Sequence, residues 1–222
     1  NERFKLNYIL EMGKDHDVKL KLAVDYLKYL GTDAMSPSQK EEEFYKLGCD
    51  LSVNCGSEKT TITLSGLANN FDESVALFEQ ILAGAVADDE ALENLKLSEL
   101  KGRNDAKLNK QIILWRAMGS YAKYGVNSSF MNILSEEELA NVTADELLDL
   151  IHNLTSYEHK IMYYGPDEIF AVVDKLTALH TNNTELKTIP AKKEFVENDM
   201  DKPMVYIVDY DMKQAEVMML SK

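Results

Sequence analysis

Residues 22–32 read LAVDYLKYLGT, and this stretch decides how the chain is expected to fold. It belongs to a run in which apolar side chains recur at helical spacing, at Leu20, Ala23, Leu27 and Leu30. This spacing predicts a helix over roughly residues 18–30 that buries one apolar stripe. Asp15 or Asp17 can cap the start of this helix, and Gly31 is expected to end it in the left-handed conformation.

A strand is expected before this helix and a second helix after it. Residues 4–12 alternate apolar with polar side chains up to Gly13, which is typical of a half-buried strand. Residues 36–39 read SPSQ, a capping box with proline at the first helical position. The second helix is therefore expected to run from this box to Gly48.

The next segment predicts a hairpin followed by mainly helical chain. Residues 51–55 alternate with polar residues, residues 61–67 are rich in β-branched side chains, and a glycine-containing turn joins the two. Asn70, with a glutamate three residues later, is expected to cap another helix. Residues 88–124 consist almost entirely of helix-forming residues, and a break is expected near 102–104.

The C-terminal third predicts shorter elements. Thr143 is expected to cap a helix, residues 160–164 to form a strand, and residues 168–180 to form a further helix. Residues 181–203 contain three asparagines, two prolines and many charges, which is typical of a linker. A further strand is expected at Met204–Tyr210.

The order of elements indicates the fold class. Strands that feed long helices suggest one layer of sheet with helices against it. We therefore expect an α+β fold, with an antiparallel-rich mixed sheet covered on one side by helices.

Charge excludes several functions. The 222 residues include 24 basic and 38 acidic side chains, a formal net charge of −14. Nucleic acid and anionic membrane surfaces both attract basic proteins, so neither is an expected partner. A basic peptide is a compatible partner, although acidity also serves solubility alone. No segment approaches the ~18 consecutive apolar residues of a membrane span.

The two cysteines and the chain ends give two further expectations. Cys49 and Cys55 are too few for a disulfide scaffold, and we expect buried free thiols. A bridge between them would require a sharp turn of the chain. Phe4 already lies inside a strand-like pattern, and the chain stops just after another one, so we expect a fragment of a longer protein.

No catalytic or metal motif is complete in this sequence. Zinc bound on one helix needs ligands three or four residues apart. The four histidines show no such pairing: His16, His152, His159 and His180. There is also no nucleophile elbow, no phosphate-binding glycine loop and no cysteine with an obvious histidine partner. The sequence therefore predicts no metal ligand and no catalytic residue in this chain.

Taken in order, these features resemble the pitrilysin/insulinase family of zinc metallopeptidases. The resemblance is carried by the run at residues 22–32 with its Gly31-Thr32 end, the capping box at Ser36, the stop at Gly48, the LSGL end of the hairpin at residues 64–67, the helix from Asn70 and the YYG strand end at residues 163–165. It covers roughly residues 3–180. Its specificity lies in the order and spacing of the elements.

The sequence departs from the family at the zinc-binding helix, which in the family carries an inverted H-x-x-E-H motif. Counted back from Gly31-Thr32, the two histidine ligands would fall at Leu22 and Tyr26, and the general-base glutamate at Asp25. Leucine cannot bind zinc, and a single tyrosine is a rare ligand, so no metal-bound hydroxide would be generated here. Leu22 and Leu27 are expected to pack this helix into the core.

The resemblance explains this departure, because family members pair homologous domains of which only one carries the metal. It implies a LuxS/mitochondrial-processing-peptidase-like metallohydrolase fold for a half-domain at residues 1–180. Residues 181–203 would then be the linker, and residues 204–222 the first strand of the following half-domain. Zinc would be bound by the catalytic domain of the parent protein, and the partner would be that homologous half-domain, on the same polypeptide.

The resemblance also implies substrate-binding residues. Silent half-domains of the family often supply an arginine and a tyrosine, about two helical turns apart, that reach the substrate. Here Arg116 with Tyr124, or less well with Tyr121, offers such a pair. Arginine donates to a peptide carbonyl and a phenol to a developing oxyanion. The structural alternative is that Arg116 pairs with a surface carboxylate and Tyr124 packs under a loop.

Two functions follow as hypotheses. The first is a non-catalytic domain of a zinc metalloendopeptidase, which closes the peptide-binding chamber and helps to bind the peptide substrate. The alternative is a peptidase-like binding or scaffold module in an assembly without proteolytic activity. The compartment is not fixed by the sequence, although a periplasmic or cell-envelope location is favoured over the cytoplasm.

Overall fold

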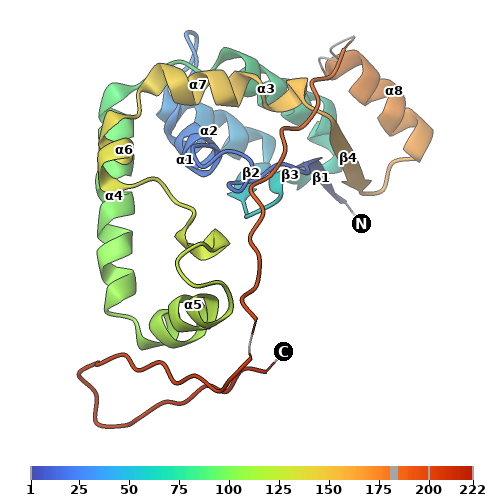
Figure 1. The fold of residues 1–222 in the computed structure, drawn as a ribbon. Coiled ribbons are helices and arrows are strands. Elements are labelled where there is room, and N and C mark those ends of the chain that lie inside the picture. The colour runs from blue at the N-terminus through green and yellow to red at the C-terminus, as the bar shows by residue number, and fades with distance from the viewer. Residues whose placement is uncertain (1, 181–184, 200, 222) are drawn as a thin grey trace.

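The computed structural model describes residues 2–180, 185–199 and 201–221, and it shows one sheet with helices packed against it (Figure 1). The strands are β1 (Arg3–Leu10), β2 (Asp50–Cys55), β3 (Thr60–Leu67) and β4 (His159–Tyr164). The α-helices are α1 (Leu20–Tyr26), α2 (Pro37–Leu47), α3 (Phe71–Gly84), α4 (Asp89–Lys107), α5 (Gly119–Tyr124), α6 (Glu136–Asn141), α7 (Ala144–His152) and α8 (Ile169–Leu179). The shorter helical turns are η1 (Leu27–Tyr29), η2 (Ala68–Asn70), the π-helix η3 (Ile112–Met118), η4 (Ser129–Met131) and η5 (Leu154–Ser156).

The sheet has the strand order β2-β3-β1-β4, and each neighbouring pair is antiparallel. In this register Leu6 of β1 lies opposite Leu64 of β3 on one side and Tyr163 of β4 on the other. Strands β2 and β4 therefore form the two edges. The predicted α+β class is confirmed, with an antiparallel sheet.

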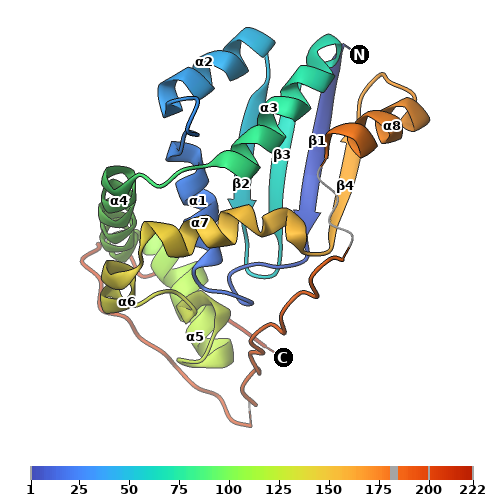
Figure 2. The same ribbon diagram turned by 90° about the horizontal axis from the view of Figure 1, so that it is seen from above.

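The core lies on one face of the sheet. The buried residues of β1 alternate along the strand, as expected for a half-buried strand: Phe4, Leu6, Tyr8 and Leu10. They meet the apolar face of α3, with the Phe4 and Phe71 rings in edge-to-face contact at 4.9 Å. Figure 2 shows α3 and α7 crossing the sheet on this side. On the opposite face the Thr63 hydroxyl donates to the Asn7 amide oxygen at 2.8 Å.

The capping boxes form as the sequence predicts. Ser36 and Gln39 exchange hydrogen bonds at the start of α2, which ends at Gly48 with a left-handed φ of 61°. Thr143 and Glu146 do the same at the start of α7. Each motif uses contacts within one turn of helix, so the local sequence is sufficient to specify it.

The end of the first helix differs from the prediction. The chain tightens into η1 after Tyr26 and turns extended at Leu30, so Gly31 is not a left-handed cap. Gly31 is required for a different reason: a Cβ atom there would collide with the backbone at Met35 and Pro37. The chain folds back on itself at this point, with Thr32 paired to Met35.

The two candidate caps of the first helix have separate roles. The Asp17 carboxylate accepts the backbone N–H of Lys19 at 2.8 Å, one residue before α1 begins. Asp15 is buried and accepts hydrogen bonds from Ser129 at 2.6 Å and Asn132 at 3.0 Å. It therefore docks a distant loop beside η4 rather than capping the helix.

Two predictions about the middle of the chain are wrong. Asn70 does not cap α3 with its side chain, because its amide donates to the Leu47 carbonyl at 2.8 Å. Helix α4 runs unbroken through residues 102–104 to Lys107, since Gly102 faces open space and disturbs no packing. The break comes at Leu108, and α5 lies across the end of α4 that is far from the sheet (Figure 1).

The predicted linker is attached to the domain along the part that the structure describes. Lys187 pairs with Tyr157 next to β4, and the Lys193 N–H donates to the Asp15 carbonyl at 2.8 Å. The Asn198 N–H then donates to the Lys123 carbonyl on α5 at 2.7 Å. Residues 181–184 and 200 of this segment lie outside the described residues.

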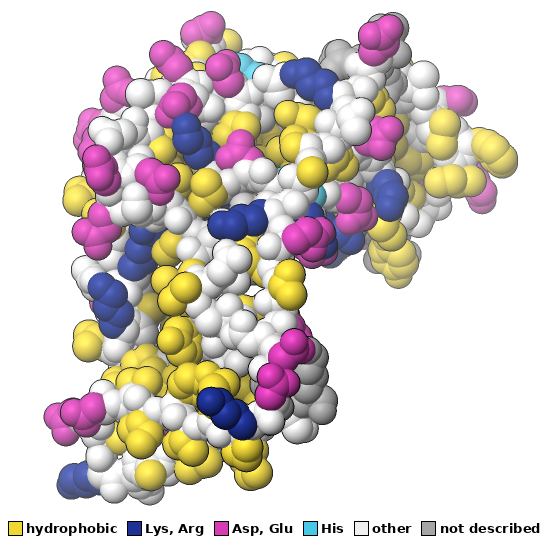
Figure 3. Space-filling model, viewed as in Figure 1, with side chains coloured by type: hydrophobic (Ala, Val, Ile, Leu, Met, Phe, Trp, Pro, Cys, Tyr) yellow, Lys and Arg dark blue, Asp and Glu magenta, His cyan; other side chains and the backbone are white. Residues whose placement is uncertain are grey.

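In the part of the chain that the structure describes, Met204–Tyr210 is not paired as a strand, and no other strand lies beside it. Val205 and Ile207 are 85% and 87% exposed. Figure 3 shows hydrophobic side chains gathered at this end of the molecule, over α5 and the C-terminal segment. Within the described residues, no helix is both long enough and apolar enough to cross a bilayer.

Candidate functional site

The first candidate site is the set of positions on α1 at which the resemblance would place zinc ligands. Leu22 is buried, with 6% of its surface exposed, and Leu27 is buried at 1%, so both are core residues as predicted. The side chain of Asp25 is 25% exposed. Figure 2 shows α1 beside β2, at the edge of the sheet.

Tyr26 has a structural role, and its hydroxyl makes two hydrogen bonds within the protein. The side chain is fully buried, and its hydroxyl donates to the Asp88 carbonyl and accepts from the Asp88 N–H, both at 2.8 Å. Asp88 is the N-terminal cap of α4. Burial raises the pKa of Tyr26, which keeps the phenol neutral. Tyr26 therefore joins α1 to the start of α4.

Asp25 is held by two lysines of its own helical segment. Its carboxylate lies 2.5 Å from the Lys21 ammonium and 2.7 Å from that of Lys28. Burial acts to raise the pKa of Asp25, but the hydrogen bonds from these lysines outweigh it and lower the pKa. A carboxylate held in this way is a poor general base, because its proton affinity is low.

These three positions do not fit zinc. Leu22 has no donor atom, the Tyr26 hydroxyl is already bonded twice, and Asp25 is neutralised by lysines. Elsewhere in the described part of the chain, no three histidine, cysteine, aspartate or glutamate side chains converge to hold a metal ion. No step of zinc chemistry is therefore assigned to this chain.

A buried polar cluster lies elsewhere, and sequence reasoning missed it. Glu79 of α3 accepts from the Tyr8 hydroxyl at 2.8 Å and lies 2.7 Å from Nδ1 of His180. Nε2 of His180 lies 3.0 Å from Nε2 of His159. Burial and the nearby Glu79 carboxylate raise the pKa of Tyr8. Glu79 and His180 alone are 101 residues apart in the sequence, so no local pattern could reveal the cluster.

The second candidate site is the segment of Arg116, Tyr121 and Tyr124. The structure does not bring these side chains onto one ligand position. Tyr124 donates to Glu197 at 3.1 Å, and this hydrogen bond raises its pKa. Tyr121 packs edge-to-face on Tyr206 at 5.4 Å. Arg116 lies in the π-helix η3, with its guanidinium 5.7 Å from the centre of the Phe130 ring.

The surroundings of Arg116 differ from the structural alternative. Among the described residues no carboxylate lies within ion-pair distance of its exposed guanidinium, and its recorded contact is with Phe130. A π-helix is rare and often occurs at functional sites. Arg116 is thus available to a ligand, whereas the two tyrosines are engaged by residues of the C-terminal segment.

A third site, which sequence reasoning did not predict, lies at the edge of the sheet. Among the described residues, strand β2 pairs on one side only, with β3. A cavity of about 290 Å³ lies against this strand, between it and residues of η1 and α2. Its lining residues are Leu27, Lys28, Lys40, Glu41, Phe44, Tyr45, Cys49, Asp50, Leu51 and Val53. The edge position of β2 depends on the topology of the whole sheet, which spacing within the strand cannot reveal.

The two cysteines lie near the two ends of β2 as free, half-buried thiols. Burial raises the pKa of both Cys49 and Cys55. A thiol with a raised pKa carries little thiolate at neutral pH and is a weak nucleophile. The thiols are free as predicted, but they are half-buried rather than buried.

Solved structures share this fold. With 89% of the chain aligned, the TM-score to the periplasmic protease PqqL from Escherichia coli is 0.71, at 15% identity and over 22% of that protein. A protease from Helicobacter pylori gives a TM-score of 0.71 at 13% identity, with 90% of this chain and 50% of that one covered. The peptidase M16 inactive domain from Pseudomonas fluorescens gives 0.69 at 17% identity, covering 87% and 49%.

The chain thus shares its fold with domains of these proteases, among them a peptidase M16 domain, which confirms the predicted fold. One of the similar structures is itself described as an inactive domain. The chain spans between about a fifth and a half of the length of these proteins. No protein-family model matches the sequence, and no curated protein matches it either.

Proposed function

We propose that this chain is a non-catalytic half-domain of a zinc metalloendopeptidase and that it binds extended peptide on the free edge of β2. Zinc would be held by a homologous half-domain on the same polypeptide, and the present domain would close the chamber around the substrate. The observation that carries the proposal is the unpaired edge of β2, beside a helix whose ligand positions are filled by core and ion-paired residues.

The hairpin geometry fixes which backbone groups face outward. The Gly56 N–H donates to the Lys59 carbonyl at 2.8 Å, and the register pairs Asn54 with Thr61 two residues further along. Hydrogen-bonded pairs alternate along an antiparallel ladder. The N–H and C=O groups of Leu51, Val53 and Cys55 therefore point away from β3, toward the free edge.

A peptide backbone is the ligand that such an edge accepts. An extended peptide can add as a further strand, with affinity from main-chain hydrogen bonds and specificity from pockets for alternate side chains. This mode tolerates many sequences, which suits a peptidase. The net charge of −14 makes neutral or basic peptides the better partners overall.

The C-terminal segment supports the proposed domain organisation of half-domain 1–180, linker 181–203 and a following strand from residue 204. Its residues have strand-forming side chains, yet Val205 and Ile207 are almost fully exposed. An apolar strand of this kind is stabilised by pairing with a sheet. A following half-domain would supply that sheet.

Replacing Val53 with proline is expected to weaken peptide binding about tenfold or more, because the outward N–H is lost and the ring projects into the added strand. The probe is a fluorescein-labelled, amidated heptapeptide of alternating threonine and valine, and the measurement is fluorescence anisotropy. Proline on this side of an edge strand leaves the bonds to β3 intact.

Val53→Ala is the matched control, since it shortens the same side chain but keeps the N–H. It should bind the peptide clearly more tightly than Val53→Pro, because the outward N–H is retained. Equal binding by the proline variant and the unmodified chain would rule out the β2 edge as the peptide site.

The purified chain, incubated with zinc chloride and dialysed, should retain well below one zinc ion per molecule, because the α1 positions offer no ligand set. Metal analysis by plasma mass spectrometry measures this. A stoichiometric zinc content, with peptide cleavage that a chelator abolishes, would contradict the proposal.

The scaffold alternative shares the fold and the β2 edge but not the catalytic partner. The two functions differ in the parent protein: an H-x-x-E-H helix in a second half-domain supports the peptidase. A parent protein that binds peptides without cleaving any of them would favour the scaffold.

A further inference from the structure

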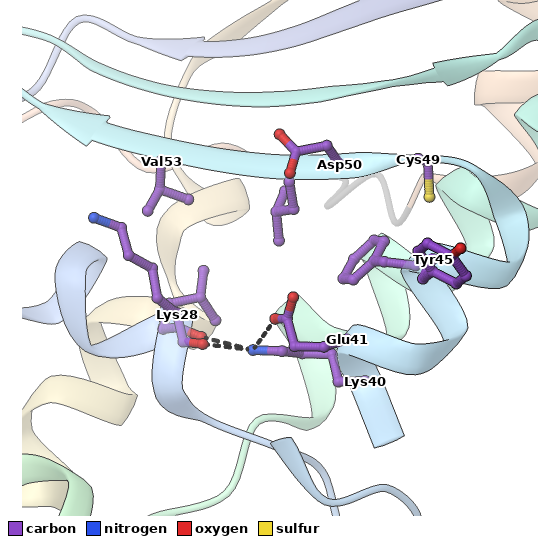
Figure 4. A pocket seen from close by; sticks show the side chains of 10 residues that line it. Lys28, Lys40, Glu41, Tyr45, Cys49, Asp50 and Val53 are labelled. Carbon is purple, nitrogen blue, oxygen red and sulfur yellow. Dashed lines mark hydrogen bonds and ion pairs between the residues drawn. The ribbon is translucent and has the colours of Figure 1, made fainter. Parts of the chain in front are cut away.

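The cavity beside β2 has an apolar wall, and charged side chains also line it (Figure 4). Leu27, Phe44 and Leu51 contribute apolar side chains, and Lys40 of α2 reaches in from the side opposite the strand. At about 290 Å³ the cavity lies at the lower limit of small-molecule sites. Its size suits one amino-acid side chain better than a whole small ligand.

Lys40 is an unusual residue for such a place. Only 2% of its surface is exposed, although lysine is almost never fully buried without a partner. Its ammonium donates to the Lys28 carbonyl at 2.8 Å and to the Leu27 carbonyl at 3.5 Å. Burial lowers the pKa of Lys40, because the charged form is poorly solvated there.

The charge of Lys40 is incompletely balanced. Glu41 provides the nearby carboxylate, but its Oε1 atom lies 3.8 Å from the ammonium, beyond hydrogen-bond distance, and its side chain is 72% exposed. Among the described residues, the third N–H of the ammonium therefore has no hydrogen-bond acceptor. Lys28 also lines the cavity, but its ammonium is paired with Asp25 at 2.7 Å.

We propose that this cavity receives the carboxylate of one glutamate or aspartate side chain of the bound peptide, which pairs with Lys40. This inference rests on the proposed function, since the peptide would be the strand added to β2. The acidic residue would replace the exposed Glu41 as the partner of the buried ammonium. Its methylene groups would contact the apolar wall.

The register of the sheet places a peptide side chain at this cavity. Directly opposite residues of neighbouring strands point to the same face of a sheet. Leu51 and Val53 line the cavity, and the intervening Ser52 is exposed on the other face. A peptide residue opposite Leu51 or Val53 therefore points toward the cavity, whereas its two neighbours point away from it.

The chemistry of the lining favours a carboxylate over a cationic side chain. A charge-assisted hydrogen bond to the buried Lys40 ammonium is stronger than its contact with Glu41 across 3.8 Å. A peptide lysine would instead lie close to the Lys40 ammonium. The remaining acidic residue of the lining, Asp50, is exposed and belongs to the outer face of the strand.

The test uses the alternating heptapeptide with a central guest residue, Thr-Val-Thr-X-Thr-Val-Thr, in which X is glutamate, glutamine or lysine. The unmodified chain should bind the glutamate peptide about tenfold more tightly than the glutamine peptide, as a charged hydrogen bond implies. Lys40→Met keeps the length of the side chain but should abolish this ratio. Glu41→Gln removes the competing carboxylate and should increase it.

Lys46→Met is the matched control, because Lys46 lies on the same helix, is 54% exposed and does not line the cavity. It should leave the ratio unchanged. Circular dichroism of each variant confirms that the helices are retained, and Glu41→Gln tests the inference even if Lys40→Met does not fold.

The outcomes separate the two proposals. An unchanged glutamate-to-glutamine ratio in Lys40→Met or in Glu41→Gln, or a preference for the lysine peptide, overturns the carboxylate pocket while edge binding stands. Undiminished binding by Val53→Pro, or no binding of any peptide by the unmodified chain, overturns the proposed function and this inference with it.

Discussion

Replacing Tyr26 with alanine is expected to lower the free energy of unfolding by about 4 kcal/mol. The substitution removes a fully buried ring and leaves a cavity at the junction of α1 and α4. It also removes both hydrogen bonds to Asp88, so a buried N–H and C=O lose their partner. Urea unfolding followed by circular dichroism measures the change.

Two further variants separate the contributions. Tyr26→Phe keeps the ring and should cost about 1–3 kcal/mol, the penalty for leaving polar groups at the start of α4 unsatisfied. Asp25→Asn, at the neighbouring position, removes exposed ion pairs with Lys21 and Lys28 and should cost less than about 1 kcal/mol. A Tyr26→Ala variant as stable as the unmodified chain would show that this position is not structural.

The result bears on the role of the α1 positions that the resemblance aligns with zinc ligands. Leu22 packs in the core and Tyr26 fixes the start of α4, so these positions contribute to stability. Substituting histidine at them would place imidazoles among apolar side chains, at a cost in stability.

The parts of the fold that were predicted correctly depend on local chemistry. The capping boxes at Ser36 and Thr143 and the glycine at Gly48 satisfy backbone groups within a turn or two. The hairpin and the burial alternation of β1 follow from a period of two residues. A few neighbouring residues are sufficient to specify such features.

The wrong predictions concern positions whose local structure depends on tertiary contacts. Gly31 is required by the close approach of Met35 rather than by a left-handed turn, and Asn70 bonds Leu47 instead of its own helix. Gly102 does not break α4, because a glycine inside a helix costs only about 1 kcal/mol relative to alanine. Packing elsewhere on the helix outweighs this cost.

The candidate sites divide in the same way. The α1 positions that the resemblance aligns with zinc ligands could be placed because Gly31-Thr32 sets the frame of the helix. The free edge of β2 and the buried Lys40 could not, because both follow from the strand order and from the packing of α2 against η1. Lys40 is surrounded in sequence by polar residues that are typical of a solvated helix face.

Replacing Arg116 with alanine in the full-length parent protein is expected to lower kcat/KM for peptide hydrolysis roughly 30-fold or more. This corresponds to a loss of about 2 kcal/mol of transition-state stabilisation. Its guanidinium is exposed on a π-helix, rests on Phe130 and has no carboxylate partner among the described residues. Such a group can donate two hydrogen bonds to a peptide carbonyl without first breaking an ion pair. Steady-state kinetics with a fluorogenic peptide measures the change.

Arg116→Lys and Lys123→Ala distinguish a substrate contact from a general effect of charge. Lysine keeps the positive charge but not the planar fork, so Arg116→Lys should recover little of the lost rate. Lys123 is an exposed cation on the adjoining α5, and Lys123→Ala should leave kcat/KM unchanged because it removes charge without touching the substrate. Full activity of Arg116→Ala, or an equal loss in Lys123→Ala, would leave Arg116 with only its stacking role on Phe130, and the peptide would then be held by this domain at the β2 edge alone.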